Sequence, residues 1–113
     1  MQRGELWTLK DHNYAAKARP VVIVQADSEN NFDSVILCLF TTFISDSILT
    51  RVKIVPTTEN GLEKTSYVMT EKIVTVEKTM LGKCIGKLTD YEMHLIAGKL
   101  AKLLEIRKSD IEE

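Results

Sequence analysis

Three side chains that could bind a phosphodiester stand next to predicted strands. Arg19 ends a polar loop and directly precedes a β-branched run, so its backbone is held while its guanidinium can face solvent. A guanidinium is a planar fork of N–H donors that matches the oxygens of a phosphate. Thr41 and Thr42 follow an apolar run, where a hydroxyl can bond a phosphate oxygen. Ion pairing at a strand edge and turn formation are the commoner roles of such residues, so the residue types alone leave both roles open.

The histidines and cysteines do not form a metal-binding pattern. His12 lies in a polar loop with Lys17 and could exchange a proton near neutral pH, although most loop histidines have no chemical role. His94 falls inside a predicted helix and is expected to pack or face solvent. The sequence holds two cysteines, Cys38 and Cys84, and no HxxxH or CxxC motif. We therefore expect no metal ion and no cofactor, and two reduced thiols.

Composition and charge limit the class of protein. The chain has 113 residues, of which 44% are hydrophobic, enough for one packed domain spanning 1–113. A net charge of −1 argues against a strongly basic nucleic-acid binder. However, residues 64–87 hold five lysines against two glutamates, so a local grip on phosphate remains open. No apolar run approaches the roughly 20 residues that span a bilayer, and no signal peptide is apparent, so we expect a cytoplasmic location without membrane contact.

The elements that must position these residues are mostly short strands. The run at 35–40 is apolar at successive positions, which is typical of a central strand buried on both faces. Asn60-Gly61 predicts a turn, since both residue types tolerate positive φ. Closely spaced strands separated by turns indicate a small sandwich or barrel. The expected strands are 5–9, 21–25, 35–40, 51–56, 67–69 and 73–76.

The C-terminal segment has the period of a helix. Thr89 and Glu92 form a capping box, in which each side chain satisfies a backbone N–H of the other residue. Apolar residues then recur at helical spacing, with lysines outside the stripe. The sequence predicts a helix over about 89–107 that packs on the strands.

Short segments of this sequence, in order along the chain, resemble the MazF/PemK toxin family. Each segment is a weak signal alone, but their order and spacing together cover the chain from about residue 2 to the terminal helix. The segments are RGELW at 3–7, RPVVIV at 19–24, FTT at 40–42, GL at 61–62, SYV at 66–68, EKIVTV at 71–76 and LGKCIGKL at 81–88.

The resemblance implies a mainly β fold of the SH3-like barrel type with a C-terminal helix. It also implies a homodimer, a cognate antitoxin partner and metal-independent cleavage of single-stranded RNA. By the same resemblance, Arg19 and Thr41 match the catalytic arginine and threonine, and Glu71 matches an acidic position used by some members. His12, Lys17, Thr42 and Glu71 are expected as RNA-binding or accessory residues. The proton acceptor is left open between His12 and Glu71.

Departures from the family pattern keep two alternatives in view. The loop between Trp7 and Arg19 is shorter than usual, so residues 10–18 cannot be aligned with the family. Lys72 stands where glutamine is usual, and Phe43 follows the threonines where a polar residue is common. One alternative is therefore a barrel that kept the fold and lost cleavage. The other is a gyrase-poisoning toxin of the CcdB type, whose Trp-Gly-Ile ending this chain lacks.

Overall fold

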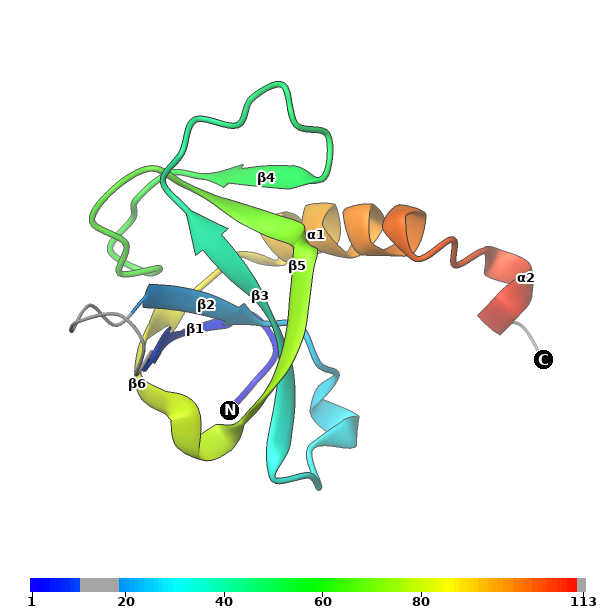
Figure 1. The fold of residues 1–113 in the computed structure, drawn as a ribbon, viewed down its shortest axis with the longest axis horizontal. Coiled ribbons are helices and arrows are strands. Elements are labelled where there is room, and N and C mark those ends of the chain that lie inside the picture. Colours follow the sequence, from blue (N-terminus) through cyan, green and yellow to red (C-terminus); the bar gives the residue numbers. More distant parts are fainter. Residues whose placement is uncertain (11–18, 112–113) are drawn as a thin grey trace.

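Six strands and two helices follow one another in the computed structural model, which describes residues 1–10 and 19–111 (Figure 1). Two single 3₁₀ turns, Asp27–Glu29 and Lys78–Met80, stand in the connections. The strands are β1 (Glu5–Leu9), β2 (Arg19–Ile23), β3 (Ser34–Thr41), β4 (Arg51–Ile54), β5 (Ser66–Glu77) and β6 (Leu81–Lys87), and the helices are α1 (Asp90–Leu103) and α2 (Lys108–Ile111).

The strands form one antiparallel sheet in the order β4-β5-β3-β2-β1-β6. The predicted mainly β fold with a C-terminal helix is confirmed, but within the described residues the sheet does not close into a barrel. The connection between β4 and β5, rather than β4 itself, lies against β6: the Lys87 N–H donates to the Glu59 carbonyl at 2.8 Å. This connection therefore occupies the place where the last strand pairing of a closed barrel would form.

The strands β2 and β3 bury apolar residues on both faces, as the apolar run at 35–40 predicts, but Ile36 within that run is exposed. One face of β3 places Cys38 and Phe40 in a cluster with residues of α1, including Met93 and Ile96. The opposite face places Val35 and Leu37 in a second cluster. Burying apolar side chains on both faces fixes the ends of these two strands, and Arg19 and Thr41 stand at those ends.

A bulge interrupts the pairing of β5 with β3. Cys38 pairs with Ile73, but the next residue, Leu39, pairs with Met69, so the residues Thr70, Glu71 and Lys72 have no partner in β3. Inserted residues bend a strand, and β5 changes direction sharply along its length (Figure 1). The sequence pattern predicts two strands, 67–69 and 73–76; the structure has one strand with the bulge between these pieces.

The capping box of α1 forms as predicted: the Glu92 N–H donates to Thr89 Oγ1, and Glu92 accepts from the Thr89 N–H. The helix ends at Leu103, before the predicted end near residue 107, and Glu105 adopts a positive φ of 55° that a helix cannot contain. The last part of the apolar stripe is not covered, and Leu104 remains 54% exposed. In the part of the chain that the structure describes, no helix is long and apolar enough to cross a membrane.

Candidate active site

A groove of about 620 Å³ crosses four neighbouring strands of the sheet. The strands are β6, β1, β2 and β3, which are neighbours in the sheet. The connection between β4 and β5, together with Ser66 at the start of β5, forms the remaining wall. The lining residues are Thr8, Arg19, Pro20, Phe40, Thr41, Thr42, Gly61, Leu62, Glu63, Lys64, Ser66, Lys83 and Ile85.

The structure brings together Arg19 and Thr41, the two residues predicted to be catalytic. Arg19 is exposed at the start of β2, and Thr41 is half-buried at the end of β3. The two strands pair in a register that places Val21 opposite Leu39, and extending it by two residues sets Arg19 opposite Thr41. Both side chains line the groove. A phosphate in the groove would therefore meet a guanidinium and a hydroxyl from adjacent strands.

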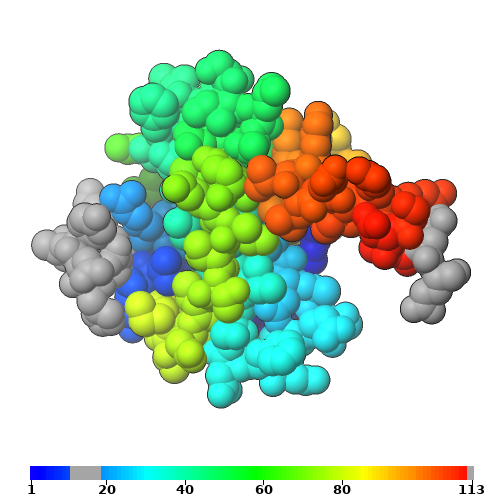
Figure 2. All heavy atoms as spheres, turned by 45° about the vertical axis from the view of Figure 1, so that its right-hand side comes forward, coloured from blue at the N-terminus to red at the C-terminus, as the bar shows by residue number. Residues whose placement is uncertain are grey.

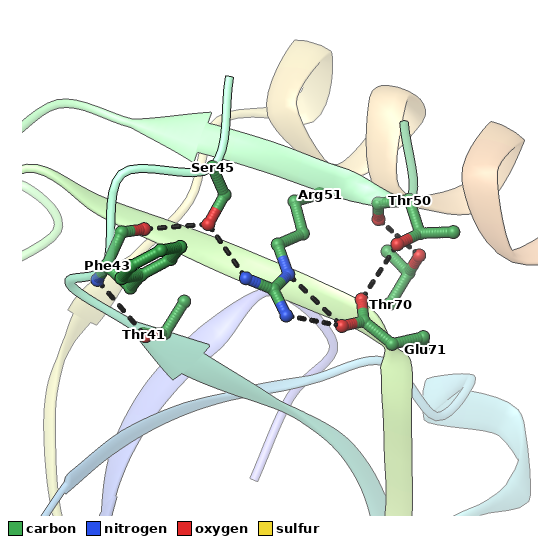
Figure 3. Close-up of polar contacts among 7 residues, drawn as sticks. All are labelled: Thr41, Phe43, Ser45, Thr50, Arg51, Thr70 and Glu71. Atoms are coloured by element: carbon green, nitrogen blue, oxygen red, sulfur yellow. Dashed lines mark hydrogen bonds and ion pairs between the residues drawn. The ribbon is translucent and has the colours of Figure 1, made fainter. Parts of the chain in front are cut away.

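The hydroxyl of Thr41 is held by the turn that follows it. Its Oγ1 accepts a hydrogen bond from the Phe43 N–H at 3.1 Å (Figure 3). A hydroxyl that accepts in this way still has its own proton to donate. Thr42, the predicted accessory residue, is exposed and also lines the groove.

The side chain of Asn60 holds the connection between β4 and β5 together through its hydrogen bonds. This side chain is almost fully buried, donates from Nδ2 to the Val55 carbonyl and accepts from the N–H groups of Thr57 and Leu62. Gly61 follows with a φ of +70°, which confirms the predicted turn, and a Cβ there would lie 2.1 Å from the carbonyl oxygen of Ile85. The turn is thus pressed against β6.

Several groove residues were not assigned to the site by the sequence. Lys64 and Lys83 belong to the lysine-rich segment 64–87. The local positive charge of that segment could have indicated them as groove residues. No sequence pattern indicates that Thr8 belongs to the groove. Its Oγ1 accepts a hydrogen bond from the Lys83 N–H at 3.0 Å, between the paired strands β1 and β6. With Arg19, the two lysines give three cations against one acid, Glu63, so the described lining carries a formal charge of +2.

Glu71 is not among the groove residues. It lies in the bulge of β5, where its Oε2 forms an ion pair with Arg51 Nη2 at 2.8 Å and its Oε1 accepts from Thr50 Oγ1 at 2.8 Å (Figure 3). Burial raises the pKa of Glu71, but the hydrogen bonds from Arg51 and Thr50 outweigh it and hold the pKa below its ordinary value. A carboxylate held in this way is a poor proton acceptor.

The other polar residues considered from the sequence are two accessory candidates and two cysteines. His12 and Lys17 fall outside the described residues. Cys38 is buried, which together with the charge of Glu71 raises its pKa to about 12, whereas Cys84 is exposed. In the described ranges, 1–10 and 19–111, no group of three or more His, Cys, Asp or Glu residues is placed to hold a metal ion.

A second hollow, of about 670 Å³, lies under the end of α1 and is lined mainly by apolar side chains. Figure 2 faces this side: the orange and red atoms of the C-terminal segment stand above the cyan atoms that connect β2 to β3. Ile36, Leu100, Leu104 and Ile106 are among its lining residues. The two hollows share no lining residue, so the chain presents a polar groove and a separate apolar one.

Comparison with known proteins decides the family. Residues 2–104 match the model of the PemK-like, MazF-like toxins of type II toxin-antitoxin systems. The chain belongs to this toxin family. A protein named probable endoribonuclease MazF from Mycolicibacterium smegmatis is 36% identical over 94 residues, which cover 82% of this chain and 86% of the relative.

Solved structures of MazF-like toxins share the fold. A mycobacterial endoribonuclease, solved in complex with its cognate antitoxin, superimposes with a TM-score of 0.79 at 28% identity, covering 95% of this chain and 97% of that one. MazF in a MazE–MazF complex from Deinococcus radiodurans also gives a TM-score of 0.79, at 15% identity, with the same coverage of 95% and 97%. At that identity the second likeness concerns the fold alone.

Proposed function

We propose that this MazF-like toxin is an endoribonuclease that cleaves single-stranded RNA without a metal ion, at the groove that contains Arg19 and Thr41. The observation that carries the proposal is the position of these two side chains. They stand at adjacent strand ends in one positively charged groove. The family, and a relative named as a probable endoribonuclease, support the same activity.

RNA supplies the nucleophile for this reaction. The 2′-OH attacks the neighbouring phosphorus, the bond from phosphorus to the 5′ oxygen breaks, and the products carry a 2′,3′-cyclic phosphate and a 5′-OH. The 2′-OH loses its proton to a base, and the departing 5′ oxygen gains one from an acid, for which Arg19 is the candidate in the groove. Arg19 would stabilise the negative charge that develops on the phosphorane, and Thr41 would donate its proton to a non-bridging oxygen. Thr42 and Lys17 are proposed to contact the RNA backbone.

The base that accepts the proton of the 2′-OH is a histidine or a carboxylate. Of the two predicted candidates, Glu71 is occupied by Arg51 and Thr50, which argues for His12. Glu63, a carboxylate that lines the groove, is a further candidate. If a histidine is the base, the cleavage rate should fall as the pH drops below about 6.5, the ordinary pKa of imidazole.

We also propose a homodimer that works in the cytoplasm and is silenced by a cognate antitoxin. The similar mycobacterial endoribonuclease was solved with its antitoxin, which supports an antitoxin partner here. The apolar hollow under α1, with Leu104 and Ile106 at its rim, offers a surface of the kind that protein partners bind. RNA as substrate favours the cytoplasm.

The test is incubation of the purified protein with a long single-stranded RNA in EDTA, followed by mapping of the cleaved ends. We expect cuts that leave 5′-OH ends, suppressed by the cognate antitoxin. Arg19→Ala should lower the cleavage rate at least about 100-fold, since removing one charge-stabilising donor costs that much. Arg107→Ala, in an exposed C-terminal ion pair, is the matched control and should cleave normally.

Two results would contradict the proposal. Intact RNA after incubation with folded wild-type protein would support the alternative in which the chain kept the toxin fold and lost cleavage. Intact RNA together with inhibition of supercoiling by DNA gyrase would identify the gyrase-poisoning alternative.

A further inference from the structure

We infer that Arg51 is a positioning residue for the reaction: anchored by Glu71, it fixes the turn after Thr41 and so aims the Thr41 hydroxyl into the groove. The inference rests on the proposed function, because it gives a network away from the groove a role in cleavage. It also assigns Glu71 to support of the site rather than to contact with RNA.

An unbroken chain of contacts joins Glu71 to Thr41 (Figure 3). Arg51 donates from Nε and Nη2 to Glu71 Oε2, at 3.1 and 2.8 Å, and from Nη1 to Ser45 Oγ at 2.8 Å. Ser45 Oγ in turn donates to the Phe43 carbonyl at 2.7 Å. The Phe43 N–H then donates to Thr41 Oγ1.

This chain holds both polar groups of the Phe43 backbone. Its carbonyl is bound by Ser45 and its N–H is directed at Thr41, so the peptide on each side of Phe43 has little freedom to rotate. Ser45 is only 2% exposed and uses its hydroxyl proton on Phe43 while it accepts from Arg51. The orientation of the Thr41 hydroxyl therefore depends on where Arg51 holds Ser45.

The anchor is stiff because it is charged and partly withdrawn from water. The side chains of Arg51 and Glu71 are 15% and 26% exposed, and two N–H groups of Arg51 converge on one carboxylate oxygen of Glu71. Charge-assisted contacts of this kind are stronger than neutral ones and fix direction as well as distance. Thr50 occupies the other oxygen of Glu71, so both oxygens are committed to structure.

The location of Glu71 in the bulge explains how the anchor forms. Thr70, Glu71 and Lys72 have no partner in β3, so this part of β5 is released from the regular pleat. Thr70 Oγ1 donates to the Thr50 carbonyl, which ties the bulge to the residue before Arg51. The bulge thus brings the carboxylate to the start of β4, next to the turn it supports.

The test compares three variants that alter one link each: Ser45→Ala, Arg51→Lys and Glu71→Gln. With a short RNA substrate, each should lower kcat about 10- to 100-fold and leave KM within about twofold, because misdirection of a catalytic group impairs the chemical step more than binding. Arg107→Lys makes the same change in the exposed Arg107–Glu105 pair and should leave both constants unchanged.

A double-mutant cycle separates positioning through Thr41 from a direct role. In a Thr41→Ala background, Ser45→Ala and Glu71→Gln should cause no further loss of kcat, since their effect passes through the missing hydroxyl. If Glu71 accepts the proton itself, Glu71→Gln would lower kcat equally in both backgrounds while Ser45→Ala left it unchanged. That result would overturn the inference.

The Phe43 amide gives a readout that does not depend on activity. In Ser45→Ala and Arg51→Lys its NMR signal should shift and its hydrogen exchange should accelerate, because its acceptor at Thr41 is no longer fixed. If these variants lower only the melting temperature, and kcat and the Phe43 amide stay as in wild type, the network is merely structural and the inference fails. If the wild-type protein cleaves no RNA while Ser45→Ala and Arg51→Lys show the expected Phe43 response, the proposed function is overturned instead.

Discussion

The two cysteines differ in what surrounds their sulfur atoms. Burial, together with the charge of Glu71, raises the pKa of Cys38 to about 12, so its thiol stays neutral in the folded protein. Cys84 is exposed on β6, with its thiol near the Gly86 carbonyl. The thiolate is the reactive form of cysteine, so chemical reactivity should belong to one residue.

We expect a thiol reagent at pH 8 to modify one group per native chain and two after denaturation in guanidinium. Mass spectrometry of the native product should place the label on Cys84, and Cys84→Ser should remove it. Rapid labelling of Cys38 in the native protein would show that the core around β3 opens more readily than its burial implies.

At the residue scale, the sequence predicts the groove better than it predicts the supporting network. Arg19 and Thr41 are predicted because each directly adjoins a buried strand and matches a family motif. Both features are visible in a few consecutive residues of the sequence. The partner of Glu71 is Arg51, which is distant in sequence and on another strand. No local pattern links them, because the bulge that brings them together is a property of the pairing between β3 and β5.

At the scale of elements, glycine placement decides whether the groove wall can form. Gly61 combines a positive φ with close contact to the Ile85 carbonyl, whereas Gly98 in α1 has nothing within 4 Å of an added Cβ. We therefore expect the same substitution to have opposite effects at the two positions.

Gly61→Ala should destabilise the protein by more than about 2 kcal/mol, from backbone strain and displacement of the wall. Gly98→Ala should stabilise it by roughly 0.5–1 kcal/mol, since alanine favours a helix and restricts the unfolded chain. Urea unfolding of both variants measures the two free energies. Equal stability of Gly61→Ala and wild type would mean that the wall is not pressed against β6.

The predicted boundaries agree with the structure within one residue for β1 and β3. The predicted strand 21–25 lies at 19–23 in the structure, and the predicted strand 51–56 ends at Ile54. The sequence does not predict β6, because two glycines, Gly82 and Gly86, interrupt its apolar pattern. Both glycines are required by close neighbours: a Cβ at Gly82 would lie 2.4 Å from Thr8 Oγ1, and one at Gly86 would lie 2.3 Å from the Glu59 carbonyl. Tertiary contacts that select glycine remove the side-chain signal by which a strand is predicted.

For the whole molecule, a net charge of −1 coexists with a groove of +2. RNA binding should therefore rely on a few phosphate contacts and depend only moderately on salt. A 2′-deoxy oligonucleotide, which cannot be cleaved, should bind with a slope of about −2 in log affinity against log salt, roughly −0.7 for each of three cations.

Fluorescence anisotropy over a range of KCl concentrations measures this slope. Lys83→Ala should make the slope shallower by about 0.7. The matched control Lys102→Ala, on the exposed surface of α1, should leave it unchanged. A slope of zero would mean that the groove does not hold phosphate, and a much steeper one would require cations beyond the described lining.

The pairing of β3 with β5 has a further consequence for how this chain tolerates changes in length. On one side of the bulge, the residue numbers of two paired residues add up to 111, as for Cys38 and Ile73. On the other side they add up to 108, as for Leu39 and Met69. Excising Thr70–Lys72 would remove this difference of three and return both halves to one continuous ladder with every β3 partner retained. Deletion of only one or two of these residues would instead leave the two halves of β5 in different registers against β3. The inferred support for Thr41 is thus an insertion that the ladder can lose as a unit, so the pairing with β3 and the positioning of Thr41 are encoded in separable stretches of β5.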